Sequence, residues 1–244
     1  MGYRPNPHAR ALRSQKTGII ALWIPDQIST HYSHVARELS RMVKATGHEL
    51  IISEVGVSDM KGIWSHVPVD LMAGTMEVMA YLIGTGFRRI AHATFVRKSL
   101  PQESRRLGYV EAMKEAGLKT EFMLYPLSER QRPVARQLIQ DYVRDHGRPE
   151  AIFCHSDDVA RGIYRGLCDA GISVPGDIAL VGCDGIEDTE YLECPLTTLV
   201  QPVAEMCATA WGFLQMRLED WTRPAQHAVL RPRLAIRESS GRPV

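Results

Sequence analysis

The chain of 244 residues lacks the features that mark secreted and membrane proteins. It has no run of about 18 apolar residues that would cross a membrane. Its N-terminus has no apolar segment followed by a small-residue cleavage site, as a secretory signal would. The five cysteines form no Cys-x-x-Cys pair, and an odd number argues against a disulfide framework. These absences predict a cytoplasmic protein with buried, reduced thiols.

The motifs of common enzymes are absent as well. There is no Gly-x-Ser-x-Gly elbow, no Walker loop and no Gly-x-Gly-x-x-Gly fingerprint. The nine histidines include no His-x-x-x-His pair with a glutamate partner, so neither a metal nor another cofactor is expected. Cys183 precedes an acid, Asp184, which raises rather than lowers the pKa of a thiol. An enzyme using Asp157 and Asp184 would lack a recognisable acid–base pattern, so we predict no enzymatic activity.

The chain also lacks a large excess of either sign of charge, except at the N-terminus. The first sixteen residues contain no acid and four cations, namely Arg4, Arg10, Arg13 and Lys16. The rest of the chain has 25 basic and 28 acidic residues, a balance that does not favour DNA binding. A basic arm with one isolated apolar residue, Leu12, suits phosphate contact plus a wedge in a minor groove. A solvated, disordered terminus has the same composition.

Apolar runs alternate with stretches of helical periodicity along the chain. The runs predict strands at residues 18–24, 48–55, 89–95, 122–127, 151–154 and 178–181. Apolar residues at helical spacing predict helices around residues 35–43, 78–83, 107–113, 134–143, 158–170 and 203–210. The first run, Gly18–Ile24, is nearly unbroken, which predicts a parallel strand buried on both faces. This alternation predicts an α/β fold with βαβ units and parallel sheets.

Polar residues follow several of the predicted strands, namely Asp26, Ser156, Asp157 and Asp184. Ligands of parallel α/β folds bind outside the carboxyl ends of the strands. Polar groups gathered there can hydrogen-bond a small polar molecule. Structural roles explain the same residues, because Asp157 or Asp158 could cap the following helix and Asp184 could form a turn.

The N-terminal residues also carry a specific pattern. Gly2-Tyr3-Arg4-Pro5-Asn6, then Ala9-Arg10-Ala11-Leu12, then Thr17-Gly18-Ile19-Ile20 resemble the hinge of the lactose-repressor (LacI/GalR) family of bacterial transcription regulators. Six further blocks resemble the same family in order, at residues 86–91, 105–109, 152–162, 174–184, 195–202 and 234–240. Phe87 replaces a usual histidine of the family, and Ser156 stands where asparagine is usual. Ordered blocks from residue 2 to residue 240 make a chance resemblance very improbable.

The resemblance implies a two-lobed, periplasmic-binding-protein-like α/β fold with parallel sheets, a ligand cleft between lobes and three strand crossovers. It divides the chain into a hinge arm (1–16), an N-terminal lobe (17–94 and 199–226) and a C-terminal lobe (95–198 and 227–244). The implied protein is a homodimer that binds a small polar effector, a sugar or sugar derivative, and thereby controls its affinity for operator DNA. The alternative is a transport-type sugar-binding protein of the same fold.

The family pattern also places candidate functional residues. The effector-binding candidates are Arg105, Asp184, Asp26, Tyr32, Ser156 and Asp157. An arginine fork can donate hydrogen bonds to two hydroxyl oxygens, and an aspartate can accept hydrogen bonds from hydroxyl groups. Together these two side chains suit sugar recognition. The DNA-contacting candidates of the hinge are Arg4, Asn6, Arg10, Leu12 and Arg13.

Two departures from the family pattern limit what carries over. The helix-turn-helix that precedes the hinge in the family is absent from the sequence as given, so specific operator binding is expected only in a form that carries it. About 35 to 40 residues that usually follow the second strand of the first lobe are also missing, and Glu54–Trp64 bridges the gap. Because a parallel crossover needs about a dozen residues or more, we expect a smaller sheet in the first lobe.

Overall fold

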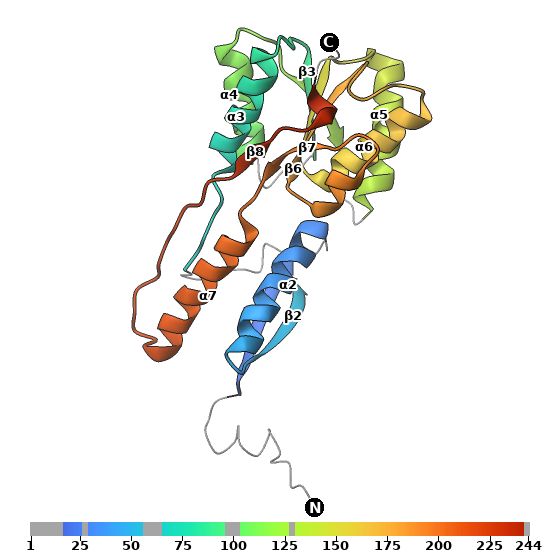
Figure 1. Ribbon diagram of the computed structural model, residues 1–244. Coiled ribbons are helices and arrows are strands. Elements are labelled where there is room, and N and C mark those ends of the chain that lie inside the picture. Colours follow the sequence, from blue (N-terminus) through green and yellow to red (C-terminus); the bar gives the residue numbers. More distant parts are fainter. Residues whose placement is uncertain (1–16, 26–28, 56–64, 96–102, 127–129, 242–244) are drawn as a thin grey trace, which may run out of the picture. The chain divides into compact units, whose positions relative to one another are not determined.

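The computed structural model describes residues 17–25, 29–55, 65–95, 103–126 and 130–241. The chain divides into two compact units, coloured along the sequence in Figure 1. The first unit comprises residues 1–28, 32–66 and 203–227, and the second comprises residues 29–31, 67–202 and 228–244. The strands and helices alternate as the sequence predicts. Two helices are longer than predicted, because the helix predicted around residues 78–83 begins at Leu71 and the one around 203–210 ends at Glu219, and the strands at Thr197–Val200 and Arg233–Ala235 were not predicted.

The second unit is built on one sheet of six strands in the order β4-β3-β5-β6-β7-β8. These strands are β3 (Ile90–Phe95), β4 (Glu121–Tyr125), β5 (Ala151–Cys154), β6 (Ala179–Asp184), β7 (Thr197–Val200) and β8 (Arg233–Ala235). Each neighbouring pair is parallel except β7 and β8, which are antiparallel. The parallel register, for example Phe153 opposite Val181, places the carboxyl ends of β3, β5, β6 and β7 along one edge.

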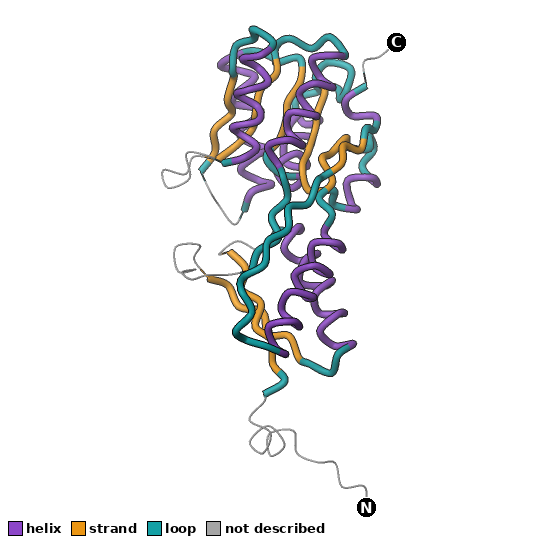
Figure 2. Tube along the Cα trace, turned by 90° about the vertical axis from the view of Figure 1, so that its left-hand side faces the viewer, coloured by secondary structure: helices purple, strands orange, loops and turns teal. Residues whose placement is uncertain are grey.

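Helices cover both faces of this sheet, as Figures 1 and 2 show. The helices are α3 (Leu71–Gly84), α4 (Ser104–Glu115), α5 (Gln131–His146) and α6 (Asp157–Asp169), and short 3-10 turns follow at Glu187–Tyr191 and Glu238–Ser240. On one face, Phe153 and its neighbours pack with α3 and α4. On the other face, Ile152 and its neighbours pack with α5 and α6. Successive residues of β5 therefore serve opposite cores, which explains why this strand is apolar throughout.

Among its described residues, the first unit contains a sheet of two parallel strands, β1 (Ile19–Pro25) and β2 (Glu49–Val55). Its helices, α2 (Thr30–Ala45) and α7 (Val203–Glu219), pack against each other through Val35, Val203 and Cys207. The small sheet agrees with the expectation drawn from the shortened first lobe.

The prediction that the first strand is buried on both faces is wrong. Ile24 is buried, but Ile19 is 44% exposed and Trp23 is 49% exposed, and Ile51 on β2 is 52% exposed. In the register of the sheet, Ile51 lies opposite Ala21, so these residues share the face that carries Ile19 and Trp23. No described helix covers that face, and its apolar side chains remain in contact with water.

The units do not coincide with the lobes predicted from the sequence. Residues 67–94 belong to the second unit, because β3 pairs with β4 and β5 there. Apart from residues 29–31, the chain passes between the units after His66, Pro202 and His227. Parallel bridges join His66 to His227 and Val69 to Leu230, so two of the connecting segments run side by side.

Candidate functional site

Polar side chains gather at the carboxyl edge of the second unit's sheet. His155 follows β5, Asp184 ends β6, and Gln201 follows β7. Glu103 and Arg105 lie at the N-terminus of α4, which follows β3 in the chain. Parallel strands bring their carboxyl ends to one edge, so these residues, distant in sequence, meet in one cluster.

Arg105 is at the centre of this cluster. Its Nε donates to Glu103 Oε1 over 2.7 Å, and its Nη2 lies 2.8 Å from His155 Nε2. Among the described residues, the acceptor found for Nη1 is a distant sulfur, Cys183 Sγ at 3.9 Å. The Arg105 side chain is 14% exposed. The guanidinium is thus held on two sides, and Nη1 keeps capacity for a stronger acceptor.

Glu103 holds Arg105 while it also begins the helix. It is the N-cap of α4, and its Oε2 accepts a hydrogen bond from the backbone N–H of Arg106 over 2.9 Å. Burial alone would raise the pKa of Glu103, but the Arg105 charge and the backbone N–H groups outweigh burial and lower it. The carboxylate is therefore ionised at neutral pH.

His155 contributes to the cluster as a neutral ring. Because Nε2 faces the Arg105 donor, it must act as the acceptor, which assigns the proton to Nδ1. Burial first, and then the neighbouring Arg105 charge, lower the pKa of His155 well below its usual value. The ring also meets the Phe95 ring edge to face, with 4.5 Å between the centroids.

Two buried aspartates stand beside this group with different contacts. Asp184 accepts a hydrogen bond from Gln201 Nε2 at Oδ1 over 2.7 Å. Its φ of 130° is a conformation that favours glycine, so the fold holds an aspartate here in spite of backbone strain. Asp157 uses both oxygens internally, accepting from Thr198 Oγ1 and from the Ile186 N–H at 2.7 Å each. Burial raises the pKa of both aspartates.

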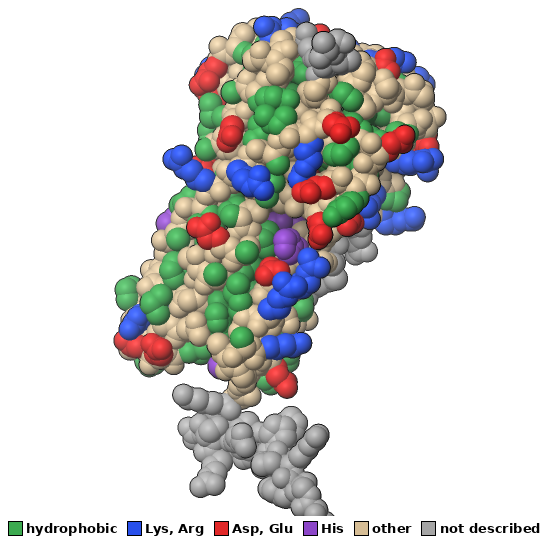
Figure 3. Space-filling model, in the orientation of Figure 1, with side chains coloured by type: hydrophobic (Ala, Val, Ile, Leu, Met, Phe, Trp, Pro, Cys, Tyr) green, Lys and Arg blue, Asp and Glu red, His purple; other side chains and the backbone are tan. Residues whose placement is uncertain are grey.

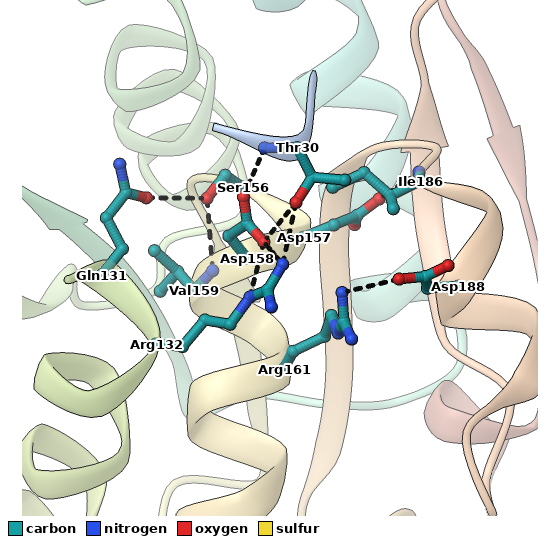
Figure 4. Close-up of polar contacts among 10 residues, drawn as sticks. All are labelled: Thr30, Gln131, Arg132, Ser156, Asp157, Asp158, Val159, Arg161, Ile186 and Asp188. Atoms are coloured by element: carbon teal, nitrogen blue, oxygen red, sulfur yellow. Dashed lines mark hydrogen bonds and ion pairs between the residues drawn. The ribbon is translucent and has the colours of Figure 1, made fainter. Parts of the chain in front are cut away.

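The start of α6 carries a separate polar network, drawn in Figure 4. Ser156 is the N-cap, and its hydroxyl oxygen accepts from the Val159 N–H. Asp158 accepts from the Thr30 N–H and hydroxyl over 3.0 Å each, and it forms an ion pair of 2.6 Å with Arg132. The helix is thus capped by Ser156 rather than by Asp157 or Asp158.

The structure brings together some of the predicted site residues and gives others structural contacts. Arg105 and Asp184 belong to one cluster, and the Arg105 charge opposes the effect of burial on the Asp184 pKa. Ser156 and Asp157 make the helix-cap and internal hydrogen bonds given above. Tyr32 lies on α2 and belongs to the first unit. Asp26 and the hinge candidates Arg4, Asn6, Arg10, Leu12 and Arg13 lie outside the described residues.

Sequence analysis missed Glu103, His155 and Gln201. His155 directly precedes Ser156 at a strand end, and Gln201 is the last residue but one of the block at residues 195–202, so position alone could have indicated both. Glu103 gives no such signal, because only the fold turns its carboxylate toward Arg105. Four of the five cysteines are buried, but Cys168 is exposed, contrary to the expectation of buried thiols.

Within the described part of the chain, no three His, Cys, Asp or Glu side chains form a group that could hold a metal ion. The same residues include no helix long and apolar enough to cross a membrane. On the face drawn in Figure 3, acidic and basic side chains are interspersed.

Comparison with known proteins identifies the family. Residues 79–240 match the model of the periplasmic binding protein-like domain. The chain belongs to this family of periplasmic binding protein-like domains. A crystal structure of a LacI family transcriptional regulator from Enterococcus faecium with bound ribose aligns with a TM-score of 0.81 and 19% identity, covering 91% of this chain and 98% of that one. This likeness confirms the predicted fold class.

The resemblance to the lactose-repressor family is confirmed by its curated relatives. The chain is 32% identical over 160 residues to the ribose operon repressor of Haemophilus influenzae, which covers 65% of this chain and 48% of the relative. It is 25% identical to the transcriptional regulator DegA of Bacillus subtilis, over 98% of this chain and 86% of that protein. The DegA alignment runs over 298 positions, more than the 244 residues here, so DegA carries additional residues within the matched stretch. In the first of these matches the chain spans about half the length of the relative.

Proposed function

We propose that this chain is the ligand-sensing core of a cytoplasmic transcription regulator of the lactose-repressor type. A small polar effector, a sugar or sugar derivative such as the ribose named for the relatives, would bind at the Arg105–Asp184 cluster. The single observation that supports this proposal is the cluster itself. The Arg105 donor fork touches Cys183, the residue before Asp184, and the Arg105 charge acts on the Asp184 carboxylate at the carboxyl edge of the same parallel sheet.

Effector binding would control DNA affinity through reciprocal coupling, because a ligand that prefers one conformation shifts the population toward it. In this proposal the protein is a homodimer. Operator DNA is contacted through the hinge residues Arg4, Asn6, Arg10, Leu12 and Arg13, in a form that carries a helix-turn-helix. The relatives are regulators rather than transport proteins, so the transport-type alternative has no observation in its favour. We propose no catalytic role for any residue.

Ligand titration of site variants tests this function. The first step is a thermal-shift screen against pentoses, hexoses and nucleosides, followed by calorimetry on the compounds that bind. Arg105→Lys removes the planar fork, and Asp184→Asn removes an ionisable acceptor, so each should weaken binding by about 2 kcal/mol, or about thirtyfold in Kd. Arg161→Lys is the matched control, because Arg161 pairs with Asp188 outside the cluster. The absence of any stabilising compound at millimolar concentration would contradict the proposal.

A further inference from the structure

The charge balance of the cluster restricts the ligand more than its shape does. Arg105 is its cation, and it is already paired with Glu103 at 2.7 Å. His155 adds no positive charge, because the ring accepts from Arg105 and stays neutral. Asp184 adds a negative charge when ionised and none when protonated. In both states of Asp184, the cluster of Arg105, Glu103, His155 and Asp184 has no net positive charge.

Glu103 is fixed in this position. Its two carboxylate oxygens have separate tasks, one holding Arg105 and the other capping α4. Swinging the carboxylate away would break both hydrogen bonds and leave the first turn of the helix without its side-chain cap. When a ligand binds, the Glu103 carboxylate therefore still neutralises the charge of Arg105.

Three neighbouring cations in the part of the chain that the structure describes are also engaged. Arg106 lies over the Phe122 ring, 4.7 Å from its centroid. Arg132 pairs with Asp158, and Arg161 pairs with Asp188. None of these three arginines is placed to balance an additional negative charge beside Arg105. The two nearby aspartates, Asp157 and Asp184, can contribute only negative charge.

We propose that Glu103 makes the site selective for uncharged polyhydroxylated ligands and excludes their phosphate esters and uronic acids. This inference rests on the proposed function. Hydroxyl groups can accept from Arg105 Nη1 and donate to Asp184 without adding charge. A phosphate or carboxylate would lie within a few ångströms of Glu103 in a site that is poorly screened, and like charges at that distance repel strongly. Glu103 thus acts as a specificity-determining residue by neutralising the arginine.

The test compares neutral and anionic partners of the same sugar on the full chain. Each neutral pentose or hexose that binds in calorimetry is paired with its terminal phosphate ester, and each hexose also with its uronic acid. A methyl ether at the same position controls for size, because it adds bulk without charge. We expect the methyl ether to bind within about tenfold of the parent sugar and the anions to bind at least about a hundredfold more weakly.

Glu103→Gln supplies the second arm, because it removes the charge and keeps a side-chain oxygen that can cap the helix. It should improve the affinity for the anion relative to the neutral sugar by about tenfold or more. Glu111→Gln is the matched control, since it makes the same charge change on the same helix at an exposed position paired with Lys114. This control should leave the ratio of the two affinities unchanged.

The outcomes separate the inference from the proposed function. Equal binding of neutral and anionic partners by the natural chain would overturn the role of Glu103 and leave the sugar-binding function standing. An unchanged ratio in folded Glu103→Gln would do the same. If that variant does not fold, the comparison of ester and ether on the natural chain still decides. Binding of no sugar at all would overturn both proposals.

Discussion

The two sheets of this protein both contain apolar strands, but these strands differ in how deeply they are buried. β1 and β5 are both apolar runs in parallel pairing, yet Phe153 of β5 is fully buried whereas Trp23 of β1 is 49% exposed. The second unit has six strands with helices on both faces, and the first has two strands with an apolar face left open. The burial of a strand therefore depends on the neighbouring strands and on the helices that cover its sheet, and the composition of the strand alone does not determine it.

Large-to-small substitutions provide the strongest test of this difference. Phe153→Ala should lower the free energy of unfolding by about 4 kcal/mol, because it leaves a cavity beside the stacked His92 ring. Trp23→Ala should cost about 1 kcal/mol or less, since half of the Trp23 side chain already contacts water. Urea unfolding followed by circular dichroism measures both. Equal losses would mean that the exposed face of the first unit is covered in solution.

The loss of stability in acid should arise in the second unit, from the buried side chain of His92. Burial lowers the pKa of His92 to about 4, although the hydrogen bond from its ring to the Phe153 carbonyl opposes this shift. Because the folded-state pKa lies below the unfolded value of about 6.5, the stability gained from a neutral His92 is present above pH 6.5 or so and is lost as the pH falls toward 4. The loss amounts to about 3 kcal/mol at most.

The His92→Gln variant removes this titration. Between pH 7 and pH 4 it should lose less stability than the natural chain, by up to about 3 kcal/mol. His34→Gln, at a 40% exposed position on α2, should follow the natural curve. Thermal unfolding at half-unit pH steps makes the comparison, and parallel curves for His92→Gln and the natural chain would refute the assignment.

Two glycines, one in each unit, test the same difference in packing with the addition of a single methyl group. A Cβ at Gly182 on β6 would lie 2.0 Å from Asp157 Oδ1 and 2.9 Å from Leu196 Cδ2, so Gly182→Ala should destabilise by about 1–3 kcal/mol. A Cβ at Gly212 on α7 meets nothing within 4 Å. Gly212→Ala should therefore stabilise by about 0.5–1 kcal/mol, because alanine favours a helix interior. Melting temperatures that move in the same direction would contradict this pair.

Local patterns predicted the elements well, because apolar spacing depends only on neighbouring residues. The run at residues 151–154 and the helical spacing after it correspond to β5 and α6 within one or two residues. Contacts between distant segments escaped prediction. Asp157 follows a strand end as a ligand-binding residue would, but Thr198 and Ile186 occupy both of its oxygens, and these partners come from segments 29 to 41 residues away.

The same limit explains the missed site residues. Arg105 was predicted as a site residue because its motif is local. Its partner His155 lies fifty positions further along the chain, and only the ordering of β3 beside β5 brings the two together. The neutralisation of Arg105 by Glu103 also needed the N-cap geometry of α4, which no apolar spacing encodes.

The discontinuous path of the chain has a consequence for synthesis on the ribosome. All of β3 to β7 precedes α7, whereas the core of the first unit needs Val203 and Cys207 from α7 to pack on Val35. The strands nearest the N-terminus must therefore wait for more than 150 later residues to emerge before their unit is complete. We expect the N-terminal segment of the nascent chain to acquire protease resistance only after α7 has emerged, and not as soon as the segment itself is synthesised.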